Sequence, residues 1–124
     1  MGFFHFRKPV DINQRLEAYD AIPDALLLDV RTPVEYSSGH IPLSTNVPVQ
    51  QIESIRQITA GKNTPIFVYC YSGARSSKAV SMLREMGYTH VENIGGICAY
   101  LGRLEYGSKT AANDRIHFRT ALQN

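Results

Sequence analysis

One stretch of this 124-residue chain places a nucleophile beside groups that hold anions. Cys70 ends the apolar run 65–70, and the residues after it have the composition of a helix start. The first N–H groups of a helix lack partners within it, and the helix dipole adds positive potential at that end. Gly73 permits a positive φ, which lets successive N–H groups converge on one anion. We therefore predict that Cys70 is the catalytic nucleophile and that a cradle binds its substrate, made of Tyr71, Ser72, Gly73, Ala74, Arg75 and Ser76.

The same arrangement favours the ionised form of the sulfur. Converging N–H donors, the helix start and the permanent charge of Arg75 stabilise a thiolate over a thiol, so the pKa of Cys70 should fall below the value of about 8.5 for a free cysteine. A persulfide, or an oxyanion docked beside the sulfur, would be stabilised in the same way. The alternative is a buried structural cysteine at a strand end, and the loop composition favours the nucleophile.

Four further residues are candidates for supporting roles around this loop. Asp29 and Arg31 flank one residue of an apolar run, so they share a face of the strand, and Glu35 could join them in an ion-pair cluster. His40 follows a glycine that ends a helix. We interpret these residues first as structural pairs and a structural histidine, since a thiolate needs no base to activate it. Cys98 is interpreted as a small buried apolar residue rather than a resolving thiol.

The segments that must position these residues alternate between strand and helix patterns. Strands are predicted at 25–30, 65–70 and 90–94, with a short extended piece at 46–48 and a Gly-Gly turn at 95–96. Capping residues or helical spacing predict helices after Asp11 and Thr32, over 52–58, over 76–86 and over 97–104. Such alternation is typical of a parallel sheet covered by helices on both faces.

Length and composition indicate one domain, with a lead-in at 1–9, the folded part at 10–106 and a tail at 107–124. A net charge of +2 gives no reason to expect a nucleic-acid partner, and no apolar run approaches the roughly 20 residues needed to span a bilayer. The N-terminal residues are apolar and then basic, which is the reverse of a secretory signal. We therefore expect a cytoplasmic protein with free thiols, no metal and no membrane association.

Four segments, in the right order, resemble the signatures of the rhodanese family. Cys70 to Arg75 fits the family's Cys-x-x-Gly-x-Arg loop, residues 28–36 with 39–42 resemble its first signature, 46–48 the extended piece after it, and 95–100 its final Gly-Gly turn. The resemblance implies a doubly wound α/β fold with a central parallel sheet of about five strands, flanked by helices on both faces.

The resemblance also implies a sulfurtransferase without a cofactor. Cys70 would take sulfane sulfur from thiosulfate or a similar small donor and pass it to cyanide or a thiol acceptor, either a small thiol or a thioredoxin-like protein, as a monomer or weak homodimer. Tyr71 departs from the family, since many single-domain members carry Arg there.

Two other functions remain open. One is a slow or non-catalytic persulfide carrier or partner-binding module. The other is a cysteine-based phosphatase or arsenate reductase, whose Cys-x5-Arg loops are one residue longer than the segment from Cys70 to Arg75.

Overall fold

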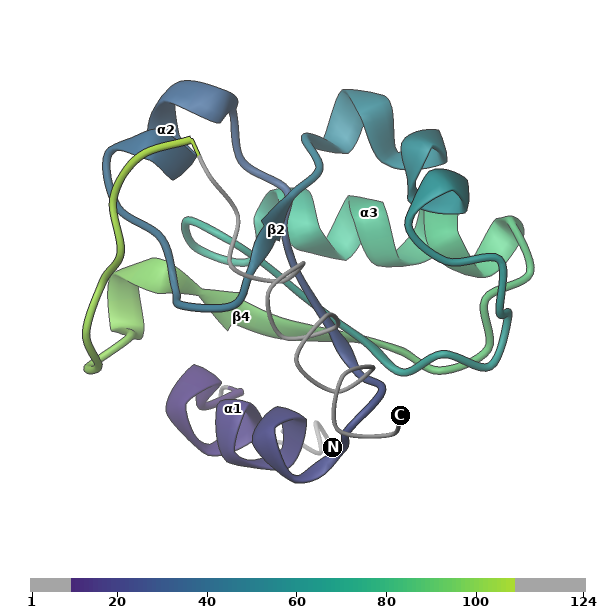
Figure 1. The fold of residues 1–124 in the computed structure, drawn as a ribbon, viewed down its shortest axis with the longest axis horizontal. Coiled ribbons are helices and arrows are strands. Elements are labelled where there is room, and N and C mark those ends of the chain that lie inside the picture. The colour runs from purple at the N-terminus through teal and green to yellow at the C-terminus, as the bar shows by residue number, and fades with distance from the viewer. Residues whose placement is uncertain (1–9, 109–124) are drawn as a thin grey trace, which may run out of the picture.

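The computed structural model describes residues 10–108, so the expected lead-in and most of the expected tail lie outside the described residues. Within them, four parallel strands form one sheet in the order β2-β1-β3-β4 (Figure 1). The described part of the chain thus has four strands where the resemblance implied about five. The strands are β1 (Leu26–Asp29), β2 (Thr45–Asn46), β3 (Ile66–Cys70) and β4 (Val91–Gly96).

Helices cover both faces of this sheet, as predicted. Figure 1 shows α1 on one side and α3 on the other. The 3₁₀ helix η1 packs with α3, and residues of both contribute to the same apolar cluster. The helices are α1 (Ile12–Ala21), α2 (Pro33–Ser37), η1 (Val49–Gln57), α3 (Ala74–Glu85) and the single turn η2 (Ile97–Ala99). No helix in the range 10–108 combines the length and apolarity needed to cross a bilayer.

The two central strands are buried along their whole length, which explains their continuous apolar sequences. Successive side chains point to opposite faces of a strand. In β3, Val68 and Cys70 therefore join the cluster under α3, while Phe67 and Tyr69 join the cluster under α1. Cys70 is thus the last side chain of a buried row, at the edge of the sheet where α3 begins.

The predicted helix caps are present. The Asp11 carboxylate accepts a hydrogen bond from the backbone of Asn13 at 3.0 Å and starts α1. Thr32 and Glu35 form a reciprocal capping box at the start of α2. This box fixes Glu35 on the first turn of a short helix.

Two local predictions near the C-terminal end of the sheet were wrong. The expected helix 97–104 is only the turn η2, because Tyr100 takes an extended conformation that ends the turn, and Leu101, which follows it, is 87% exposed. The expected turn at Gly95 and Gly96 is instead the end of β4. Segment 52–58 also differs from the prediction in detail, because most of it lies in the 3₁₀ helix η1.

Candidate active site

Cys70 lies at the carboxyl end of β3, and α3 begins at Ala74, so the predicted strand-to-helix junction is present. Gly73 precedes the helix with φ +106°, a left-handed conformation that L side chains rarely adopt. Open parallel sheets bind ligands at this edge. The Cys70 residue is only 1% exposed, whereas Tyr71 is 55% exposed, so the sulfur lies beneath a loop that faces solvent.

Hydrogen-bond donors of the loop face the sulfur of Cys70. The backbone N–H of Gly73 donates to Sγ at 3.0 Å, and the hydroxyl of Ser76, itself fully buried, lies 3.4 Å from Sγ. Burial alone would raise the pKa of the thiol. The hydrogen bonds from the Ser76 hydroxyl and from the backbone N–H groups of Ser76, Gly73 and Ser72 outweigh burial, and the pKa of Cys70 is lowered. The loop therefore favours the thiolate, mainly through hydrogen bonds.

Arg75 does not offer a free positive charge to the loop. Its two terminal nitrogens donate to the two carboxylate oxygens of Glu35, at 2.6 and 2.9 Å. This paired hydrogen bond, with the donors of the α2 capping box, holds the pKa of Glu35 at about 2. Because both side chains are about one-third exposed, the pair forms part of the rim of the loop.

The expected cluster of Asp29, Arg31 and Glu35 is divided into two separate pairs. Glu35 binds Arg75, whereas the buried Arg31 binds the fully buried Asp29 at 2.6 Å and donates to the backbone oxygen of Gly39 at 2.8 Å. These contacts tie the end of β1 to the segment after α2. They support the structural interpretation of Asp29 and Arg31.

His40 is buried, and its contacts are with Tyr36 and Glu105 rather than with the Cys70 loop. Its ring stacks on Tyr36 with centroids 3.7 Å apart, and its Nδ1 lies 2.8 Å from the backbone oxygen of the same tyrosine. Its backbone pairs with Glu105. These are the contacts of a structural histidine.

Cys98 is exposed, which corrects the expectation that it is a small buried residue. It lies in the single turn η2, directly after β4. Its backbone N–H donates to the oxygen of Tyr71 at 3.1 Å, so the residue lies beside the loop. Both cysteines are free thiols.

Sequence reasoning missed two residues of β4 that contact the loop. Asn93 lies within hydrogen-bond distance of Gly73 and of Ser76. Gly96 packs directly under the backbone of Tyr71 and Ser72. The Gly-Gly pair was a signal for close backbone approach, whereas Asn93 had the appearance of an ordinary half-buried strand residue.

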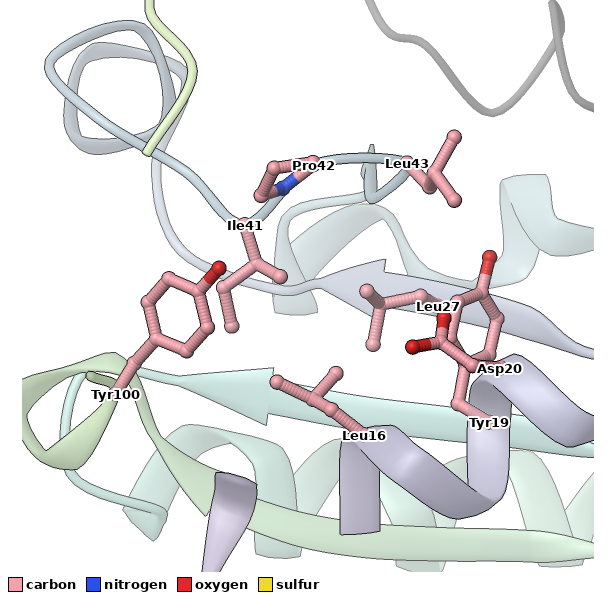
Figure 2. Close-up of a pocket in the computed structure, with 8 residues that line it drawn as sticks. All are labelled: Leu16, Tyr19, Asp20, Leu27, Ile41, Pro42, Leu43 and Tyr100. Carbon is pink, nitrogen blue, oxygen red and sulfur yellow. The ribbon is translucent and has the colours of Figure 1, made fainter. Parts of the chain in front are cut away.

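A separate hollow lies on the α1 face of the sheet, where apolar side chains of α1 and of the segment after α2 converge (Figure 2). None of its lining residues belongs to the loop 70–76, and it contains no thiol. The chemistry of the Cys70 loop therefore does not take place in this hollow. Its lining residues are Leu16, Tyr19, Asp20, Leu27, Ile41, Pro42, Leu43 and Tyr100.

Comparison with known proteins agrees with this geometry. The family model described as "Rhodanese-like domain" matches residues 9–102. Thiosulfate sulfurtransferase PspE of Escherichia coli K12 is 42% identical over 71 residues, covering 56% of this chain and 68% of that protein. A sulfurtransferase of Allochromatium vinosum is 42% identical over 78 residues, covering 62% and 72%. A solved structure described as "rhodanese with anions from E. coli" superposes with a TM-score of 0.63 at 37% identity, covering 67% of this chain and 99% of that one.

Proposed function

The chain belongs to the rhodanese-like domain family, and on that premise we propose that it is a sulfurtransferase that carries sulfane sulfur as a persulfide on Cys70. Relatives at 42% identity are named as sulfurtransferases, one of them for thiosulfate. The observation that carries the proposal is the pair of donors on Sγ, the Gly73 N–H at 3.0 Å and the Ser76 hydroxyl at 3.4 Å. They stabilise negative charge on sulfur, which is the state that attacks a sulfur donor.

In the first half-reaction, the thiolate of Cys70 attacks the outer sulfur of thiosulfate or a similar donor. A bond forms between Sγ and that sulfur, the sulfur–sulfur bond of the donor breaks, and sulfite leaves with the electron pair. The terminal sulfur of the resulting persulfide carries the negative charge. Tyr71, Ser72 and Ala74 are exposed, so a small anion can approach this end of the loop from solvent.

In the second half-reaction, cyanide or a thiolate attacks the terminal sulfur. The acceptor–sulfur bond forms as the persulfide bond breaks, and the thiolate of Cys70 is regenerated. The donors that stabilise the attacking thiolate also stabilise it as a leaving group. A small thiol or a thioredoxin-like protein fits the second step equally well, since the loop is at the surface.

Sulfur loading tests this proposal directly. After incubation with thiosulfate, the intact protein should gain about 32 Da, the mass of one covalently bound sulfur. Cys70→Ser should abolish the gain with the fold unchanged, and Cys98→Ser should keep it. Treatment with cyanide should then remove the added mass. A Cys98→Ser variant that loses loading as completely as Cys70→Ser would refute the single-cysteine mechanism.

A slow persulfide carrier is the second candidate, and the neutral rim of the loop favours it. Arg75 is paired with Glu35, and Tyr71 brings no charge, so the doubly charged thiosulfate meets little net positive potential. A carrier would load one sulfur from a persulfide donor but turn over thiosulfate and cyanide very slowly. Steady-state turnover compared with single loading separates the two functions. A phosphatase would instead hydrolyse p-nitrophenyl phosphate in a Cys70-dependent way, and we expect no such activity.

A further inference from the structure

Asn93 sits at an irregular point of β4 that turns its side chain toward the Cys70 loop. In the pairing of β3 with β4, Val68 is opposite Asn93 but Tyr69 is opposite Gly95, so Ile94 is an extra residue. Such a bulge bends the strand and redirects its side chains. Gly95 takes φ +102°, and its N–H donates to the Asn93 side-chain oxygen at 3.0 Å. The bulge and the side chain therefore hold each other in place.

The amide of Asn93 has only one orientation that satisfies its neighbours. Its Nδ2 donates to the backbone oxygen of Gly73 at 3.0 Å, and its Oδ1 accepts from the N–H of Gly95. Because one neighbour can only accept and the other can only donate, the oxygen and nitrogen cannot be exchanged. Oδ1 is thereby fixed 2.8 Å from the hydroxyl oxygen of Ser76.

The two groups that Asn93 holds, the peptide of Gly73 and the hydroxyl of Ser76, both include a donor to the sulfur. Gly73 gives its N–H to Sγ and its oxygen to Asn93, while the Ser76 hydroxyl lies between Sγ and Asn93. We propose that Asn93 is a positioning residue of the Cys70 site, which keeps the Gly73 N–H and the Ser76 hydroxyl directed at the sulfur. It does not contact the sulfur and acts only through these two neighbours.

The single proton of the Ser76 hydroxyl makes this arrangement fit both states of the sulfur. When Cys70 is a thiol, Ser76 donates to Oδ1 of Asn93 and its lone pair can accept the S–H. When Cys70 is a thiolate, the hydroxyl rotates and donates to Sγ, and Oδ1 keeps the N–H of Gly95. The buried polar groups thus remain paired in both states, so ionisation does not leave a buried acceptor without a donor.

This inference deepens the proposed function and rests on it for its role in sulfur transfer, but its test needs no sulfur donor. The rate of iodoacetamide alkylation of Cys70 is measured across pH in a Cys98→Ser background, where one thiol remains. Asn93→Ala frees both donors and should raise the midpoint by about one pH unit. Asn93→Asp keeps an acceptor for the N–H of Gly95 but replaces the Nδ2 donor to the Gly73 oxygen by a carboxylate oxygen, which brings a negative charge near the sulfur, so it should raise the midpoint further.

Asn46→Ala is the matched control. Asn46 is also a half-buried asparagine at a strand end, and its Nδ2 donates to the backbone oxygens of Asp29 and Arg31 without contacting the Cys70 loop. The pH midpoint of Cys70 alkylation in Asn46→Ala should match that of the protein with Asn46 in place. Circular dichroism establishes that each variant is folded.

Three outcomes would overturn the proposal. The first is an unchanged pH midpoint of Cys70 alkylation in both Asn93 variants. The second is a shift of that midpoint in Asn46→Ala as large as in the Asn93 variants. The third is loss of the folded state in both Asn93 variants, which would assign the residue to the fold alone. The proposed function is judged separately. If thiosulfate fails to load the unsubstituted protein while the Asn93 variants shift the alkylation midpoint, the positioning role stands and sulfur transfer from thiosulfate does not.

Discussion

Gly96 lies against the active-site loop with no room for a side chain, so Gly96→Ala should displace the loop. An added Cβ would lie 2.0 Å from the backbone oxygen of Tyr71 and 2.5 Å from Cα of Ser72. These are main-chain atoms, and no side-chain rotation relieves the contact. Gly96 itself has φ −128° and ψ 146°, which any residue adopts. The substitution therefore tests only the contact between position 96 and the backbone of the loop, because alanine fits the backbone conformation of Gly96 without strain.

The size of the effect follows from the distance that must be gained. Real Cβ atoms essentially never approach within 3.0 Å of another heavy atom, so the backbone oxygen at 2.0 Å must move away by about 1 Å. Overpacking of this kind costs about 1–3 kcal/mol of folding free energy. A reactive group displaced by about 1 Å loses on the order of 100-fold in rate. We expect losses of that order in alkylation of Cys70 and in sulfur loading.

The assay compares Gly96→Ala with Gly61→Ala, both in a Cys98→Ser background. An added Cβ at Gly61 meets the side-chain hydroxyl of Thr64 at 2.9 Å, and that side chain can rotate. Alkylation rate at neutral pH, sulfur gained by intact mass, and the thermal midpoint are measured for both. Gly61→Ala should retain its reactivity. A Gly96→Ala protein with unchanged reactivity and thermal midpoint would refute the argument that the sheet fixes the loop.

Three further predictions concern the ion pairs and the loop length. Arg75 holds the pKa of Glu35 at about 2 instead of its ordinary 4.5, so the pair stabilises the fold above pH 4.5 and the contribution is lost as the pH falls to about 2. Glu35→Gln should therefore lower the free energy of unfolding in urea by about 1 kcal/mol at neutral pH, given the solvent exposure of the pair. The difference should shrink as the pH falls from 4.5 toward 2, because the carboxylate takes up a proton there, and a difference of undiminished size at pH 2 contradicts this. Arg31→Ala leaves the buried Asp29 unpaired and should destabilise the fold by about 3–5 kcal/mol in the same assay, and a loss below about 1 kcal/mol contradicts it. Insertion of one glycine after Gly73 widens the loop and moves the donors away from the sulfur. Because loss of positioning is costly in rate, sulfur loading should fall by roughly tenfold or more. Unchanged loading would show that the length of the loop is not decisive.

Most of the framework was predictable because its signals are local. Strands β1 and β3 are buried on both faces, so each is a continuous apolar run that can be recognised without knowledge of its neighbours. The capping box at Thr32 and Glu35 lies within four consecutive residues. The position of Cys70 at the junction between a strand and a helix follows from the same local patterns.

The contacts that complete the site were not predictable, because they join segments that are distant in sequence. Glu35 and Arg75 are 40 residues apart, and their pairing depends on α2 lying beside the start of α3. Asn93 reaches Gly73 across 20 residues, and only because a bulge at Ile94 turns its side chain. No periodicity in a single sequence reports a bulge that is set by the register of two strands.

The way the thiolate is stabilised explains why these distant contacts matter. A fixed positive charge acts over several ångströms and tolerates small displacements, but the charge of Arg75 is shared with Glu35. Hydrogen bonds weaken steeply when their distance or angle changes, and the thiolate of Cys70 depends on hydrogen bonds from Gly73, Ser76 and Ser72. Such a site depends on the features that fix the positions of the hydrogen-bond donors. Here these features are the bulge of β4 with Asn93 and the close contact of Gly96 with the loop backbone. The uncharged residues of β4 should therefore control the reactivity of Cys70 more strongly than the charged residues around the loop.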